Sequence, residues 1–136
     1  MRAKTEKLIR EYYRRFNARD VDGFLDLLTD DVAHDISQGK RERGKRAFHQ
    51  FLDHMNARYR ETVRDLAVMS SPDGRRAAAE FKLSGQYLKT DGTLPKACGQ
   101  RYRLVVGAFF EIRGGRIARI SNHYNMKDWL KQIGGK

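Results

Sequence analysis

The sequence contains a single cysteine, Cys98, and only two prolines among 136 residues. One cysteine excludes an intrachain disulfide and any metal site built from several thiolates. No apolar run approaches the roughly 20 residues that a membrane-spanning helix needs, and the charged, amphipathic N-terminus lacks the apolar core of a signal peptide. We therefore expect a soluble, cytoplasmic protein without membrane contact, folded as one domain over residues 1–136.

Acidic residues are also scarce, with 17 Asp and Glu against 28 Lys and Arg, for a formal net charge of +11. Such an excess is typical of proteins that meet nucleic acid, an anionic membrane or acidic small molecules. The basic residues are densest over residues 40–46, "KRERGKR". No nucleic-acid-binding motif accompanies them, which disfavours nucleic acid as a partner. A solvated loop and a region that attracts an anionic ligand remain the two alternatives.

The hydrophobic period changes from helical to strand-like along the chain. Apolar residues at helical spacing predict a first helix through Leu8 and Phe16, a second short helix capped by Asp20, and a third that carries Phe48 and Tyr59. A strand over about residues 32–37 precedes the third helix. Four strands joined by tight turns follow, at about residues 60–71, 75–88, 100–113 and 116–125, before a short C-terminal helix. Helices followed by consecutive antiparallel strands indicate an α+β fold.

One predicted strand, "YRLVVGAFFEI", is apolar on both faces, whereas a strand with one solvated face alternates. Few elements are left to cover its second face. We therefore expect a homodimer that packs through the outer face of the sheet; a covering loop is the alternative.

Five segments then point to a known family: "DVDGFLDLLTDDVAHD", "RGKRAFHQF", "EFKLSGQYLKTDGTLP", "GGRIARISNHYN" and "DWLKQIG". In this order and spacing, the chain resembles the ketosteroid-isomerase-related, SnoaL-like branch of the NTF2-like superfamily, over nearly its whole length. The resemblance implies an NTF2-like cone, in which a curved antiparallel sheet wraps round N-terminal helices and encloses an apolar pocket, and it implies frequent dimers. It leaves the activity open, because this fold hosts many functions.

A ketosteroid isomerase uses an Asp base together with a Tyr and a protonated Asp as hydrogen-bond donors. The resemblance places the tyrosine at Tyr12, the base at Ile36 and the acidic donor at Gly107. Two of these three positions carry no suitable side chain. Steroid isomerisation by that mechanism is therefore disfavoured.

The alternation of the first strand decides which polar residue faces the interior. Val32, His34 and Ile36 share one face, and Asp35 lies on the other. The apolar pair marks the inner face, so His34 is predicted inside and Asp35 outside. A bulge between Ala33 and Asp35 would reverse this assignment.

The predicted interior combines a few polar groups with apolar side chains, and small residues at 77, 79 and 107 leave room for a cavity. We expect His34 to act as acid/base, with Tyr12 and Asn122 polarising a carbonyl group; a buried, hydrogen-bonded histidine is the alternative reading of His34. No cofactor and no metal site is expected, because acids and histidines do not cluster on one inner face. The predicted ligand-binding residues are Tyr13, Phe16, Ile36, Phe51, Phe81, Phe109, Tyr124 and Trp129.

The sequence thus predicts a protein that binds a small apolar carbonyl compound, with or without an anionic tail, inside the cone. Isomerase- or cyclase-type proton transfer without metal is the expected chemistry if the protein is an enzyme. A non-catalytic ligand-binding or dimerisation module of the same fold is the alternative.

Overall fold

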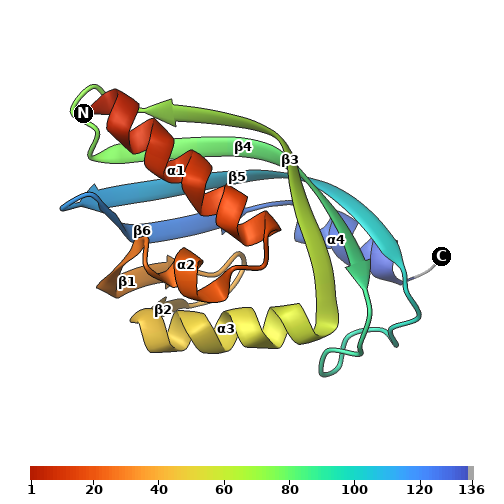
Figure 1. Ribbon diagram of the computed structural model, residues 1–136. Coiled ribbons are helices and arrows are strands. Elements are labelled where there is room, and N and C mark those ends of the chain that lie inside the picture. Colours follow the sequence, from red (N-terminus) through yellow and green to blue (C-terminus); the bar gives the residue numbers. More distant parts are fainter. Residues whose placement is uncertain (135–136) are drawn as a thin grey trace.

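A computed structural model describes residues 1–134 and shows a curved, six-stranded sheet with helices on its concave side (Figure 1). The strand order is β2-β1-β6-β5-β4-β3. All neighbouring strands are antiparallel except β1 and β6, which run parallel. The elements are α1 (Arg2–Asn17), α2 (Val21–Leu25), β1 (Leu28–Asp35), β2 (Arg41–Arg43), α3 (Lys45–Arg58), β3 (Tyr59–Ser70), β4 (Arg76–Tyr87), β5 (Arg101–Arg113), β6 (Arg116–His123) and α4 (Met126–Ile133).

α1, α2 and α3 lie on the concave side because each buries apolar side chains there. α1 crosses over β3 and β4 (Figure 1). Its Tyr13 ring packs on Phe81 of β4, with ring centroids 4.8 Å apart. Asp20 caps α2 as predicted, because its carboxylate accepts a hydrogen bond from the Gly23 amide. The α+β architecture and the order of the elements are confirmed. Within residues 1–134, no helix is both long and apolar enough to cross a membrane.

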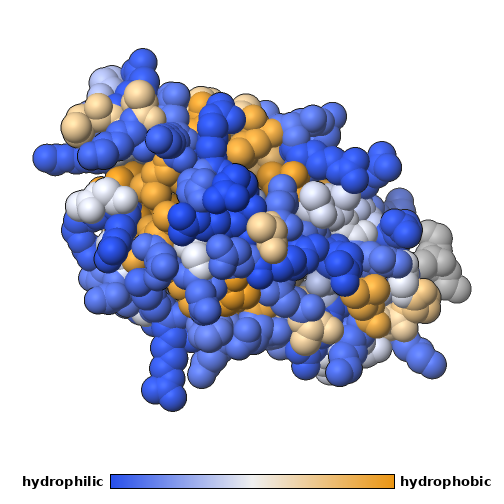
Figure 2. All heavy atoms as spheres, viewed as in Figure 1, coloured by the Kyte–Doolittle hydropathy of each residue, from blue (hydrophilic) through white to orange (hydrophobic). Residues whose placement is uncertain are grey.

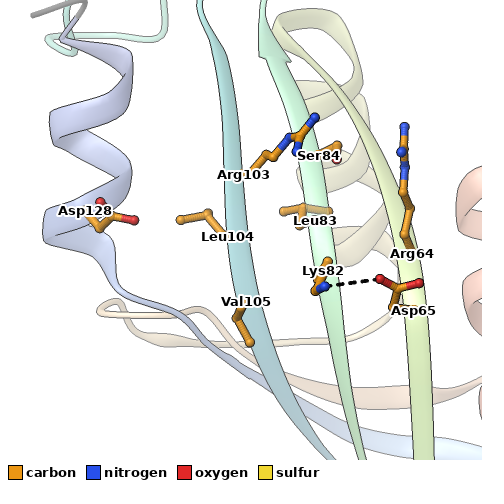
Figure 3. A pocket seen from close by; sticks show the side chains of 9 residues that line it. All are labelled: Arg64, Asp65, Lys82, Leu83, Ser84, Arg103, Leu104, Val105 and Asp128. Atoms are coloured by element: carbon orange, nitrogen blue, oxygen red, sulfur yellow. Dashed lines mark ion pairs between the residues drawn. The ribbon is translucent and has the colours of Figure 1, made fainter.

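The N-terminal half of β5 extends beyond β6, and α4 takes the place of the missing neighbour (Figure 3). The Gln132 side-chain amide accepts a hydrogen bond from the Arg103 amide at 2.8 Å and donates one to the Arg103 carbonyl at 2.9 Å. These two hydrogen bonds pair backbone groups of Arg103 that would otherwise be unpaired at this edge of the sheet. This contact fixes α4, and with it Trp129, against the open end of the sheet.

The inner face of β5 consists of the even-numbered residues, from Tyr102 to Phe110. Phe109 is 50% exposed on the outer face, so the expectation that it lines the interior is wrong. Gly107 shares that outer face and is wrong as an interior position for the same reason. Because this strand is apolar on both faces, its composition does not reveal which alternate set is buried.

Two further features concern how the strands pair. A register shift between β5 and β6 buries Ile117 and leaves Ala118 only partly buried, so the buried residues of β6 do not alternate throughout. In addition, part of the basic segment forms strand β2, paired with the end of β1, instead of an unpaired loop.

Candidate functional site

His34 lies on the concave face, in contact with two phenylalanine rings. Its side chain is 3% exposed, and its ring stacks on Phe48 at 4.3 Å and meets the edge of Phe51 at 4.6 Å. The adjacent Asp35 points outward and pairs with Arg41 at 2.5 Å and with Arg119 at 3.0 Å. The alternation of β1 therefore predicts both orientations correctly.

The bulge considered at this point does not occur. The register of β1 against β6 shifts upstream, between Leu28 and Ala33, and is regular from Ala33 to Asp35. Opposing residues of paired strands share a face. His34 therefore lies beside Ile120, and Ile120 lies beside Phe110 of β5, which places the imidazole in the central row of the concave side.

The imidazole is held in its neutral form. Burial lowers the pKa of His34 to about 4, and the nearby charge of Asp35 only partly opposes this effect. The Nδ1 atom is buried and forms no hydrogen bond with any part of the chain that the structure describes. Buried polar atoms normally have a partner. His34 therefore presents an unused hydrogen-bonding nitrogen to the interior at neutral pH.

Asp35, unlike His34, is held in its charged form. The hydrogen bond from Arg41 is the main effect that lowers the pKa of this carboxyl to about 2; burial opposes it and Arg119 adds to it. Asp35 is thus an ionised member of a surface network, which also includes Glu111 and Ser121 through Arg119.

Tyr12 and Tyr13 both lie in the core, although neighbouring side chains point about 100° apart around a helix. Their rings form an edge contact at 4.9 Å, and each also lies near Phe110. Both fit because the curved sheet covers a wide arc of α1. Burial raises the pKa of both phenols. The Tyr13 hydroxyl is buried and has no hydrogen-bond partner within residues 1–134, which makes it a second unused polar group.

The remaining predicted residues differ in how deeply they are buried. Asn122 lies opposite Ala108, an inner residue of β5, and therefore faces inward. Phe81 and Trp129 are buried in the core. The others are partly buried: Phe16, Ile36, Phe51, Asn122 and Tyr124. Phe16 and Tyr124 pack against the core, and Phe51 meets the His34 ring, whereas Ile36 follows the end of β1 and is only partly buried. An enclosed cavity on the concave side stays a prediction.

Hollows do occur on the opposite side of the sheet. One, of about 510 Å³, lies over β3, β4 and β5 beside α4 (Figure 3). Charged side chains such as Arg64 and Arg103 line it, and so do Lys82 and Asp65, which form an ion pair at 3.4 Å. Another lies between Met69 and Phe109. These hollows belong to the face that the sequence assigns to a second subunit.

Sequence reasoning missed two acidic residues of the concave side, Glu42 and Glu61. Glu42 lies directly opposite His34 in the β1–β2 pair, and its Oε1 atom is buried without a partner in the described chain. In the strand "RER", alternation places Glu42 on the opposite face from Arg41 and Arg43, so the sequence could have indicated that Glu42 faces the concave side. Glu61 accepts a hydrogen bond from the Tyr102 hydroxyl, and burial raises the pKa of its carboxyl. No group of three His, Cys, Asp or Glu side chains suited to a metal ion occurs in residues 1–134.

The contact between Tyr102 and Glu61 depends on a glycine between them. Gly85 of β4 pairs with Glu61 on one side and with Tyr102 on the other, and the tyrosine ring lies directly over it. A Cβ atom at Gly85 would lie 2.1 Å from Cζ of Tyr102. The absence of a side chain at this position therefore allows the hydroxyl to reach the carboxylate.

Gly85→Ala is therefore expected to lower the free energy of unfolding by about 1–3 kcal/mol, because the buried Tyr102 ring must move. Gly107→Ala is the control on the neighbouring strand, where an added Cβ meets nothing within 4 Å. It should change the free energy of unfolding by less than about 0.5 kcal/mol. Urea unfolding of both variants measures the difference, and equal effects would show that Tyr102 is not held against Gly85.

Comparison with known proteins agrees with this geometry. Residues 9–120 match the SnoaL-like domain family. A crystal structure from Pseudomonas putida KT2440, called a "putative polyketide cyclase", is 51% identical, with 95% of this chain and 97% of that chain covered and a TM-score of 0.94. A second protein of that description, from Xanthomonas campestris, is 45% identical, with 97% and 98% covered and a TM-score of 0.95.

More distant structures share the fold alone. One, called a "putative ketosteroid isomerase", from Kribbella flavida, is 24% identical over 91% of this chain and 79% of that chain, with a TM-score of 0.68. No curated protein sequence matches significantly. The family match covers most of the chain, and the element order, the curved sheet and the inward-facing polar groups accord with it. This chain belongs to the SnoaL-like domain family and has the NTF2-like fold.

Proposed function

We propose that the protein binds a small apolar carbonyl compound on the concave side of the sheet and transfers a proton on it. His34 is the acid/base in this proposal, and Asn122 and the tyrosines of α1 polarise the carbonyl group. The names of the similar proteins from Pseudomonas and Xanthomonas point to cyclase-type reactions on carbonyl-rich compounds. A ligand with an anionic tail would be favoured by the net charge of +11.

The observation that carries the proposal is the unused Nδ1 atom of His34, buried among aromatic rings. Leaving a buried polar atom unpaired costs about 1–3 kcal/mol. A ligand that supplies a hydrogen-bonding group would recover this free energy. Because the pKa of His34 is about 4, the imidazole is free to accept a proton at neutral pH instead of already carrying one.

The tyrosine role suits Tyr13 as well as Tyr12. A phenol whose pKa is raised by burial remains protonated and can donate to a carbonyl or enolate oxygen. Tyr13 has the unpartnered hydroxyl, and its neighbour Tyr12 packs against Phe24 at 4.4 Å. Asn122 offers a second donor from β6, in the row next to His34.

Deuterium exchange at the carbon next to the carbonyl of 2-tetralone tests this proposal without knowledge of the natural substrate. The wild-type protein in D₂O should accelerate the exchange above the buffer rate, as measured by proton NMR. His34→Gln should reduce this acceleration by about 10²–10⁴-fold, the usual contribution of a general base. His49→Gln, on the exposed side of α3, is the matched control and should exchange at the wild-type rate.

The alternative is a ligand-binding protein without catalysis. The low pKa of His34 favours this alternative, because a weak base is a weak catalyst. If 2-tetralone binds without accelerated exchange and His34→Gln binds it equally well, this alternative replaces proton transfer. Absence of any binding would overturn the concave-side ligand site itself.

We also propose that two copies associate through the outer face of the sheet. Three large apolar side chains on this face are exposed: Met69 by 52%, Val105 by 59% and Phe109 by 50%. Met69 of β3 and Phe109 of β5 line the smaller hollow, and Val105 of β5 lines the larger one. By contrast, the view of the helical side is largely hydrophilic, with apolar atoms visible between charged side chains (Figure 2).

The cytoplasmic location stays a prediction.

A further inference from the structure

The outer face of the sheet is divided into an apolar end and a cationic end. Met69 and Phe109 of the apolar end lie in one row of paired residues across β3, β4 and β5. Phe109 is six residues from Arg103, roughly 20 Å along the strand. Basic side chains gather at that other end, in three consecutive outward-facing rows. These rows are Arg60, Gln86 and Arg101, then Thr62, Ser84 and Arg103, and finally Arg64, Lys82 and Val105.

The larger hollow of the outer face, of about 510 Å³, lies among these rows (Figure 3). Its volume is within the range of roughly 300–1,000 Å³ that small-molecule sites occupy. Arg64 and Arg103 come from the two strands that flank β4, and Ser84 belongs to β4 itself. Figure 3 shows the Arg103 side chain reaching toward Ser84, and the side chains of both arginines pointing toward the same end of the strands. Two guanidinium groups and a hydroxyl group thus line one end of the hollow.

The two arginines of the hollow have no acidic partner in the part of the chain that the structure describes. The two carboxylates of the hollow are engaged elsewhere. Asp65, in a left-handed conformation (φ 53°) where the register of β3 shifts, pairs with Lys82 at 3.4 Å. Asp128 of α4 accepts a hydrogen bond from Gln132 at 2.9 Å. Both guanidinium groups are therefore free to bind a ligand.

The charges around the hollow favour an anion. Three basic and two acidic side chains line it, and Arg60 and Arg101 in the adjoining row add two positive charges. A recess with an excess of one sign of charge raises the local concentration of ligands of the opposite sign. Val105, 59% exposed, adds an apolar surface to the lining. An anionic group attached to a small apolar body matches this combination.

We propose that the hollow binds a small organic phosphate ester, with the phosphoryl group between Arg64 and Arg103 and the organic part against Val105. Guanidinium groups match the geometry of phosphate oxygens and bind them through paired hydrogen bonds. The Ser84 hydroxyl supplies a further donor. This site lies on the opposite side of the sheet from His34 and does not depend on the proposed function.

Isothermal titration calorimetry with phenyl phosphate tests the site. At pH 8 and low ionic strength the ester is a dianion and charges are little screened, so the wild-type protein should bind one molecule per chain. Arg64→Gln combined with Arg103→Gln should raise the Kd about tenfold, the equivalent of about 1.4 kcal/mol. Arg64→Lys combined with Arg103→Lys keeps both charges but loses the paired hydrogen bonds, and should raise the Kd about threefold.

The matched control is Arg76→Gln combined with Arg116→Gln, which removes the same charge from two exposed arginines outside the hollow and should keep the wild-type Kd. Circular dichroism confirms that each variant is folded, and the lysine variant serves if the glutamine variant of the hollow is not. Equal weakening in the two glutamine variants would come from net charge alone and overturns the site, as does absence of binding to the wild-type protein.

Two further probes test the class of ligand. Benzenesulfonate has the same ring but a single charge, and inorganic phosphate has the charge without the ring, so both should bind more weakly than phenyl phosphate. Inorganic phosphate that binds as tightly as the ester overturns an organic ligand. The glutamine variant of the hollow should exchange deuterium into 2-tetralone at the wild-type rate, so failure of this site leaves the proposed function in place.

Discussion

Acidification from pH 7 to pH 4 should lower the free energy of unfolding of the wild-type protein by about 3 kcal/mol more than that of a His34→Phe variant. The pKa of His34 is about 4 in the folded protein, against 6.5 for a free imidazole. The unfolded chain therefore binds more protons between these two values, and stability falls as the pH falls through this window. The magnitude follows from about 1.4 kcal/mol for each pKa unit. Phenylalanine preserves the stacking on Phe48 but removes the titration.

Other groups titrate nearby with different signs. Glu61, whose pKa is raised by burial, stabilises the fold as it takes up its proton, so it opposes the His34 effect. Asp35, with a pKa of about 2, withdraws stability only at lower pH, as its carboxylate is protonated. Because both groups are present in wild type and variant, they cancel in the difference between the two.

Urea unfolding at a fixed protein concentration, from pH 7 to pH 4, measures this difference. His49→Phe removes an exposed imidazole on α3 and should retain the full wild-type pH dependence. The two variants would behave alike only if the His34 imidazole were hydrated and not enclosed by Phe48 and Phe51. A direct check is the titration of the His34 ring signals by NMR, which should show no protonation above about pH 5.

The placement of His34 could be predicted from the sequence because β1 has mixed polarity. With Val32 on its face and Asp35 on the other, only one orientation buries the apolar side chains and leaves the carboxylate in water. The same reasoning failed on β5, where Val105 and Phe109 are as apolar as Leu104 and Phe110. On such a strand the buried set is decided by the partners, here α1 above and α4 beside, and not by the composition of the strand.

The contact between Glu61 and Tyr102 could not be predicted from any local pattern. Glu61 stands in the polar stretch "YRETVRDL", where charged residues on both sides give no sign of burial. It is partly buried because Tyr102, 41 residues further along the chain, reaches it across Gly85. A glycine in the middle of a strand is a weak indication of a close approach. Which ring approaches it becomes visible only when the strands are in register.

The second prediction with a large effect is that Phe109→Glu converts the protein from dimer to monomer. The chain has a mass of 15.8 kDa, so the wild-type protein should have about twice this mass by light scattering and the variant about this mass. A two-fold interface contains each residue twice. Phe109 is 50% exposed in one subunit, so burying its exposed half is worth about half of the 1.5–3 kcal/mol of a fully buried phenylalanine, roughly 0.8–1.5 kcal/mol. Loss of two therefore weakens association by about 1.5–3 kcal/mol, or roughly 10–10²-fold in Kd, before the cost of placing two carboxylates in the interface.

The variant should remain folded, because Phe109 is half exposed and its contact with another ring, that of His123, is at 5.6 Å on the same outer face. Leu88→Glu is the control: Leu88 is 46% exposed but follows the end of β4, away from the apolar side chains of the outer face, so this variant should stay dimeric. A wild-type protein that is monomeric at 100 µM contradicts the proposed dimer. A Phe109→Glu protein that remains dimeric shows that the subunits meet elsewhere, and that the apolar outer side of β5 has another role.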